Sequence, residues 1–302
     1  MARGEASTLK ILFAKKMISV SFILPKLDDF SFLIKIYAVI LSIIGVVRST
    51  PKALHYFRTR HLQKVWGIKD GDDVTVVCSE LPNAEERQFV KDVEDEGDRE
   101  FIYNLKYGDV DAYFEVIVTL LRLFPKIKLR VQSSGEVEVA RTDFARHLIL
   151  IGGPDYNSIT RKYLRKKITQ IDYRSPETEE CSSKYPEEIV IYERSTGIEY
   201  CEFTNEKDYG YFERVKNPDD PKRSIILLGG CHTIGVTGAV RAFSMFDSER
   251  GETPGTVLKN ARLVSKKISR DSEFVVVVEA ERMGQTIKTP IICARKIKIR
   301  RQ

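Results

Sequence analysis

From residue 70 onward the chain alternates short apolar runs with longer segments of helical character. The apolar runs have almost no polar residue in their interiors, which is typical of strands buried on both faces: DVTVVC at 73–78, HLILI at 147–151, IVIY at 189–192 and SIILL at 224–228. A fifth strand is expected at 127–131, and helices are expected at 109–124, 157–167 and 235–246. Strands alternating with helices predict an α/β fold with a mostly parallel, Rossmann-like sheet and helices on both faces.

The C-terminal part has a different pattern. Residues 274–279 (FVVVVE) and 286–300 are two strand-like runs joined through Met283, Gly284 and Gln285, which predicts an antiparallel edge. The cations on the last run suit an edge strand that resists unwanted pairing, an interpretation we prefer to a binding patch. Residues 198–216 predict a hairpin or meander, and the polar segment 168–186 predicts an exposed loop.

The N-terminal part contains an apolar stretch of membrane type. Phe30 to Val47 are 18 residues with one charge, Lys35, and a helix of that length spans about 27 Å. We expect a transmembrane helix over 30–48, and the alternatives are a buried core helix or an interfacial helix. The predicted divisions are an N-terminal segment 1–29, this span, a basic juxtamembrane linker 49–69 and an α/β ligand-binding domain 70–302.

The basic charge of the chain is concentrated in its N-terminal part. Residues 1–64 carry eleven Lys and Arg against three Asp and Glu, whereas the remainder is close to neutral. This distribution argues against a general nucleic-acid-binding surface. Cations after the apolar span favour a single-pass protein of the cell membrane whose C-terminal domain is cytoplasmic.

The five cysteines are scattered, and none has the spacing of a zinc site or a redox pair. We therefore expect no metal and no cofactor, and a reducing compartment is the simplest interpretation.

Two diglycine turns carry the main functional hypothesis. Gly152-Gly153 and Gly229-Gly230 each follow an expected strand and lead into an expected helix. Ligands of open α/β sheets bind outside the carboxyl ends of the strands. Glycine allows close approach of the backbone, and a helix N-terminus attracts phosphate or carboxylate. We expect both turns on one rim of one sheet, with their amide hydrogens directed into a shared hollow.

The candidate ligand-binding residues follow from these turns and from polar residues near other strand ends: Ser79, Gly152, Gly153, Asn157, Arg214, Asn217, Gly229, Gly230, His232, Thr233 and Thr237. Each has a structural alternative, because Asn and Thr also cap helices and diglycine also makes tight turns. Neither turn matches the dinucleotide or P-loop glycine pattern.

Catalytic candidates are fewer. Glu80 and Asp109, at expected strand ends, could act as a carboxylate nucleophile or base on a nucleoside, or could cap helix N-termini. Cys231 and His232 are adjacent in sequence, whereas a Cys/His nucleophile pair normally comes from distant segments.

A family resemblance rests on LILIGGPDYNSITRKYL and SIILLGGCHTIGVTGAVRAFS, with DYGYFERVKNPDDP between them. Together they are similar to prokaryotic Rossmann-like proteins that carry a GGPxxN turn and a later GGxxTxGTxxA-like turn. A related turn occurs in the C-terminal region of some archaeal surface-layer proteins. More loosely, the arrangement resembles the SLOG superfamily, whose members bind nucleotide-derived ligands or hydrolyse nucleoside bonds, some of them in antiviral defence.

The resemblance covers roughly residues 145–245. It implies a ligand site lined by the two diglycine turns, Asn157, Thr233 and Thr237. The later turn of this chain is shifted from the GTxxA form, and the chain lacks an evident Gly-Ser-Gly loop with a downstream catalytic Glu.

The sequence therefore predicts a membrane-anchored cytosolic domain that binds a nucleotide-like small molecule, as a signal sensor in a prokaryotic defence system. The alternatives are a nucleoside N-glycosidase or transferase, and a structural membrane-surface protein. The expected partners are the small molecule and the membrane, with no nucleic acid, and association into a homo-oligomer stays open.

Overall fold

The computed structural model describes residues 37–38, 40–42, 59–79, 96–135, 144–174, 189–201, 207–245, 255–283, 286–293 and 296–300. The chain divides into two compact units, Met1–Phe57 and Arg58–Gln302. Most of the expected transmembrane segment 30–48 lies outside the described residues. No helix within the described ranges is both long and apolar enough to cross a membrane.

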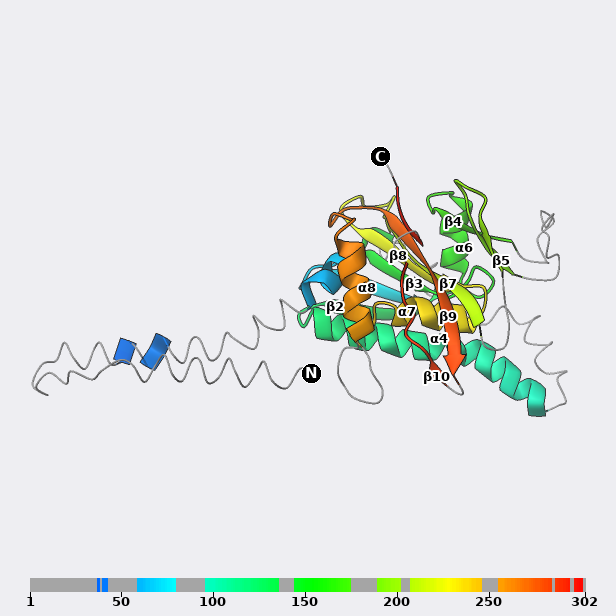
Figure 1. Ribbon diagram of the computed structural model, residues 1–302, viewed down its shortest axis with the longest axis horizontal. Coiled ribbons are helices and arrows are strands. Elements are labelled where there is room, and N and C mark those ends of the chain that lie inside the picture. The colour runs from blue at the N-terminus through cyan, green and yellow to red at the C-terminus, as the bar shows by residue number, and fades with distance from the viewer. Residues whose placement is uncertain are drawn as a thin grey trace, which may run out of the picture. The chain divides into compact units, whose positions relative to one another are not determined.

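A mixed sheet forms the centre of the second unit (Figure 1). Four of its strands are parallel and lie in the order β2 (Lys128–Ser133), β1 (Asp73–Cys78), β3 (His147–Ile151) and β8 (Ser224–Gly230). The flank beyond β8 is antiparallel and contains β7 (Lys207–Lys216), β9 (Phe274–Met283), β10 (Thr286–Ile287) and β11 (Ile297–Ile299). The prediction of an α/β fold with a parallel sheet and an antiparallel C-terminal edge is confirmed.

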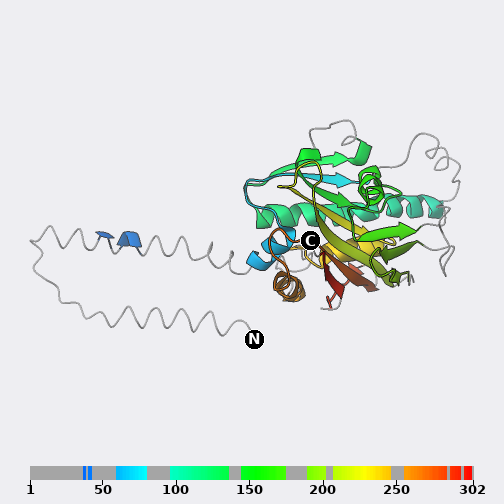
Figure 2. The same cartoon turned by 90° about the horizontal axis from the view of Figure 1, so that it is seen from above.

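Helices cover both faces of this sheet. One face packs against α4 (Glu96–Leu123), α7 (Thr233–Arg241), α8 (Gly255–Ser265) and the helix at 59–66. The other face packs against α6 (Ser158–Arg165) and a three-stranded sheet of β4 (Ile171–Arg174), β5 (Val190–Glu193) and β6 (Glu199–Tyr200). α6, β4 and β5 gather on one side in Figure 1, whereas α4 extends along the lower border of the unit in Figure 1 and across it in Figure 2.

The apolar runs form strands because each supplies side chains to both layers. In β8, Ile226 and Leu228 join the core under α4, α7 and α8, whereas Ile225 and Leu227 join the core under α6 and β4. Successive side chains of a strand point to opposite faces, so a strand that is covered on both sides needs apolar residues at every position.

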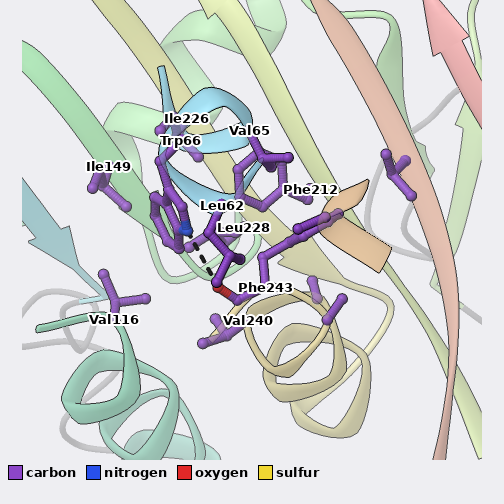
Figure 3. Close-up of a cluster of buried hydrophobic side chains, with 14 of the residues drawn as sticks. Leu62, Val65, Trp66, Val116, Ile149, Phe212, Ile226, Leu228, Val240 and Phe243 are labelled. Carbon is purple, nitrogen blue, oxygen red and sulfur yellow. Dashed lines mark hydrogen bonds between the residues drawn. The ribbon is translucent and has the colours of Figure 1, made fainter. Parts of the chain in front are cut away.

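The second half of the predicted basic linker 49–69 belongs to the core. Leu62, Val65 and Trp66 of the helix at 59–66 are fully buried. Figure 3 shows Trp66 among Phe212, Phe243 and their neighbours, and its indole Nε1 donates to the Phe243 carbonyl over 3.2 Å. The folded unit therefore includes the helix at 59–66, which precedes the predicted boundary at 70.

Three further differences from the sequence expectations affect the site. Ile171–Arg174, within the segment expected to be an exposed loop, forms β4 and pairs with β5. The expected helix 109–124 is the second half of α4, which begins at Glu96. The predicted hairpin at 198–216 resolves into β7, which lies inside the main sheet between β8 and β9.

Candidate functional site

The strand order places a topological switch point at the carboxyl ends of β1 and β3. The chain passes from β1 to β2 on one side, and β3 lies on the other side of β1. In open α/β sheets, ligands bind where the order of connection reverses in this way. Ser79, directly after β1, has its hydroxyl 3.2 Å from the Ile151 carbonyl at the end of β3. The end of β1 and the turn at Gly152 thus meet at the switch point.

The two diglycine pairs lie side by side on this rim, although Gly229 and Gly230 are the last residues of β8 and pair with β7 rather than forming a turn. β3 and β8 are parallel neighbours, and Ile151 pairs with Leu228. The amide of Gly152 donates to the Leu228 carbonyl over 3.0 Å. Gly152 has a φ of 97°, a conformation that glycine adopts without steric cost. The expected adjacency of the turns is confirmed.

The hollow expected between these turns is filled, and that expectation was wrong. The Tyr173 hydroxyl donates to the Gly230 carbonyl over 3.1 Å. A Cβ atom at Gly229 would lie 2.5 Å from the Tyr173 hydroxyl oxygen and 2.5 Å from Cε1 of Tyr211. Gly229 therefore makes room for two tyrosine rings, because any side chain there would overlap them.

The N-terminus of α7 binds a carboxylate of the chain itself. Asp208 of β7 is fully buried, and its Oδ2 accepts the amides of His232 at 3.0 Å and Gly235 at 2.5 Å. Its Oδ1 accepts the amide of Tyr209 at 2.7 Å. Burial raises the pKa of this carboxyl to about 7, even though the three N–H groups favour the charged form. Asp208 occupies the position that we expected for a ligand anion.

The α7 candidates are organised around this contact. His232 is the N-cap residue, and burial lowers the pKa of its imidazole. Thr233 begins the helix, and Thr237 is buried one turn later. The structure adds no ligand-binding geometry for these three residues, so their candidacy rests on the sequence alone.

The N-terminus of α6 is capped by a neutral amide. The Asn157 side-chain oxygen accepts the Thr160 amide at 3.0 Å, and its nitrogen is 3.0 Å from the Ile151 carbonyl and 3.4 Å from the Val77 carbonyl. Asn157 is fully buried and ties the ends of β1 and β3 to the helix. Its contribution is to hold these strand ends in place.

The first turn of α6 combines an orphaned hydroxyl with a positive helix end. The Oγ atom of Ser158 is buried and has no hydrogen-bond partner among the described residues. No acidic residue lies in the first turn of the helix. The Arg161 guanidinium donates to the Pro154 carbonyl at 2.7 Å and the Asp155 carbonyl at 2.8 Å, which fixes the preceding turn. A small anion fits this helix end better than the end of α7.

Arg214 and Asn217 lie at the opposite rim, near the start of β8. Arg214 is buried, and its guanidinium donates to four carbonyl oxygens, those of Lys64, Val65, Ser269 and Ser272, at 2.8–3.1 Å. The Asn217 amide donates to the carbonyls of Phe144 at 2.5 Å and Arg146 at 2.8 Å. The structure does not bring these two residues to the diglycine turns, and their polar groups hold loops together.

The described part of the structure adds no support for the catalytic candidates. Glu80 and the side chain of Asp109 lie outside the described part of the chain. Burial raises the pKa of the Cys231 thiol well above its usual value, and the thiol lies 3.2 Å from the Tyr200 carbonyl, which does not favour a thiolate nucleophile. The described residues contain no group of three or more His, Cys, Asp or Glu side chains that could hold a metal ion.

Sequence reasoning missed Asp208, Tyr173 and Ser158. A charged residue inside the aromatic strand DYGYFERV is a signal that could have pointed to Asp208, because buried strands rarely carry an unpaired carboxylate. Tyr173 lies in a segment whose polarity suggested a loop. Ser158 directly follows a residue that was singled out, and sequence alone does not show that its hydroxyl is buried.

Searches of protein-family models, curated proteins and solved structures found no match to this chain.

Proposed function

We propose that the folded unit binds a small nucleotide-like molecule, with its phosphate at the N-terminus of α6 beside the carboxyl ends of β1 and β3. The supporting observation is the contrast between the two helix ends on the rim. The α7 end is neutralised by Asp208, whereas the α6 end has a neutral cap and the orphaned hydroxyl of Ser158. A helix end of this kind supplies N–H donors and a partial positive charge to an anion.

The turn before α6 offers partners for the other parts of such a ligand. Asp155 supplies a carboxylate, which suits the hydroxyls of a ribose, as in other switch-point sites. The Tyr156 side chain is 41% exposed, and an aromatic ring at the surface can stack on a base. The seven residues from Gly152 to Ser158 therefore carry groups that match phosphate, sugar and base.

The proposal is tested by thermal-shift measurements of the full-length chain with nucleosides, their 5′-monophosphates, cyclic nucleotides and inorganic phosphate. We expect stabilisation by a phosphate-bearing nucleotide at concentrations where its nucleoside has no effect. Replacing Ser158 with Ala removes an unpaired buried hydroxyl, so it should leave the free energy of unfolding unchanged while it weakens binding about three- to tenfold.

Thr233→Ala is the matched control, because it removes a hydroxyl from the first position of α7. It should leave binding unchanged. No stabilisation by any nucleotide at millimolar concentration would contradict the proposal, and so would equal losses in the two variants.

Attachment of the chain to a membrane is a separate part of the proposal, supported by the 18-residue apolar run at 30–47 and the cations after it. Membrane fractions washed with alkaline carbonate test it. The full-length chain should stay in the pellet, whereas a chain with Ile40 and Ile44 replaced by Asp should be released. Release of both chains would contradict membrane spanning.

A further inference from the structure

α4 carries a second apolar face that points away from the core. Its inner face is buried and includes Ala112, Val116, Leu120 and Leu123. The opposite side has Val110, Phe114, Ile117 and Leu121, spaced four, three and four residues apart. Phe114 is 58% exposed and Leu121 is 48% exposed. We call these four residues the outer stripe of α4.

A helix that is apolar on both sides is normally covered on both sides. The spacing of the outer stripe is that of a coiled-coil seam, in which apolar residues alternate at intervals of three and four. Figure 1 shows α4 along the lower border of the folded unit, with the sheet above it. The pattern on the outer side of α4 thus suits a second helix that packs along its length.

The charges beside the outer stripe identify that helix as α4 of another copy. Asp111 and Arg122 are both exposed and lie near opposite ends of the stripe. They are eleven residues apart, about three turns, so they share one flank of the helix. The Arg122 guanidinium is oriented by donating to the Met245 carbonyl over 2.8 Å.

Orientation follows from these charges. In a parallel two-fold pair the flank that carries Asp111 and Arg122 would lie on opposite sides of the seam in the two copies, so these charges would not meet. In an antiparallel pair around a two-fold axis between residues 117 and 118, the flanks that carry Asp111 and Arg122 lie on the same side of the seam in both copies, and Asp111 lies within about 3 Å, along the helix axis, of Arg122 of the second copy. The same axis places Phe114 opposite Leu121 of the second copy, so the two most exposed apolar side chains cover each other.

We propose that the chain forms a two-fold symmetric homodimer through antiparallel packing of the outer stripes of α4. The interface is independent of the proposed ligand site, because the stripe lies on the solvent side of α4 and the site lies on the turn before α6. The two proposals can therefore fail separately.

Sedimentation equilibrium of the full-length chain in detergent tests the dimer. We expect a dimer for the unchanged chain and a monomer for Phe114→Lys, with the same helical circular dichroism because Phe114 is not part of the core. Ile198→Lys is the matched control, since Ile198 is 46% exposed on a different part of the surface. It should remain dimeric.

Charge reversal tests the orientation. Asp111→Arg alone and Arg122→Asp alone should each weaken the dimer, and the variant with both changes should recover it, because both pairs then form with reversed sign. A monomeric unchanged chain would overturn the proposal. A Phe114→Lys chain that stays dimeric would show that the copies associate through another surface. If the double variant does not recover dimer formation, the antiparallel arrangement is excluded.

Discussion

At the residue scale, three buried polar side chains of β7 hold distant segments of the chain together. Asp208 binds the N-terminus of α7, and Glu213 accepts the amides of Gln170 and Ile171 at the start of β4. Arg214 binds carbonyls of the helix at 59–66 and of the loop after α8. The sequence shows these charges within an aromatic strand but not their partners, because those groups belong to segments that approach only in the folded chain. That is why Arg214 was taken for a ligand residue.

Glu213 makes the stability of the fold depend on pH, and the pKa of its carboxyl determines the direction of that dependence. Its carboxyl is fully buried, and desolvation raises its pKa from 4.5 to about 8, against the opposing effect of the two amides. The folded chain therefore holds this proton at pH values where the unfolded chain has lost it. The stabilisation is complete below about pH 4.5 and is lost as the pH rises through 8.

The variant Glu213→Gln cannot titrate at this position. We expect the free energy of unfolding of the unchanged chain, relative to this variant, to fall between pH 5 and 8.5, with a slope of at most about 1.4 kcal/mol per pH unit. Urea unfolding at a series of pH values measures it. Burial lowers the pKa of His147 to about 4, an effect of opposite sign that both chains share and that cancels in the difference. If the free energies of unfolding of the two chains change with pH in the same way, Glu213 does not have the raised pKa.

Arg214 should be among the least replaceable residues of the fold. Its planar guanidinium reaches four carbonyl oxygens, whereas the ammonium of Lys cannot span them. We expect Arg214→Lys to lower the free energy of unfolding by about 3 kcal/mol or more, because buried carbonyl groups are left unpaired. Arg270→Lys is the control, since Arg270 is exposed and donates to the single Ile68 carbonyl. An equal effect of the two changes in denaturant unfolding would contradict the assignment.

At the element scale, strands were predictable where both faces are covered and less so elsewhere. HLILI and SIILL become β3 and β8 because every side chain has a buried side to occupy. The polar strand β4 was missed because its Asp172 and Arg174 form side-chain ion pairs, which a polar sequence does not distinguish from a loop. α8 has a mixed sequence and gave no prediction, although its Val257, Ala261 and Val264 are buried.

The two rim helices looked alike in sequence but differ in their electrostatics, which single substitutions should reveal. An added carboxylate at the first position of α6, Ser158→Asp, should destabilise the fold less than the same change in α7, because no acid lies in that turn to repel it. The same change at the first position of α7, Thr233→Asp, should destabilise it, because Asp208 already binds that helix end. Thermal unfolding of the two variants measures the contrast, and equal shifts of the same sign would refute it.

At the scale of the whole molecule, the sequence predicted where the site lies better than what fills it. Parallel strands that each end in a diglycine turn must present those turns on the same rim, and β3 and β8 do so. The filling of the space between them depends on Tyr173 and Asp208, which arrive from β4 and β7. Because packing of this kind depends on the complete fold, sequence periodicity could not predict that, of α6 and α7, α6 is the helix whose N-terminus has no acidic residue bound to it.

The most direct test of the ligand proposal is a calorimetric titration of the full-length chain with a nucleoside 5′-monophosphate and with its nucleoside. We predict that the monophosphate binds more tightly, and that Ser158→Asp weakens its binding at least about tenfold through charge repulsion while Thr233→Ala leaves it unchanged. Binding that is equally strong in both variants, or absent for every base tested, would contradict a phosphate at the α6 terminus.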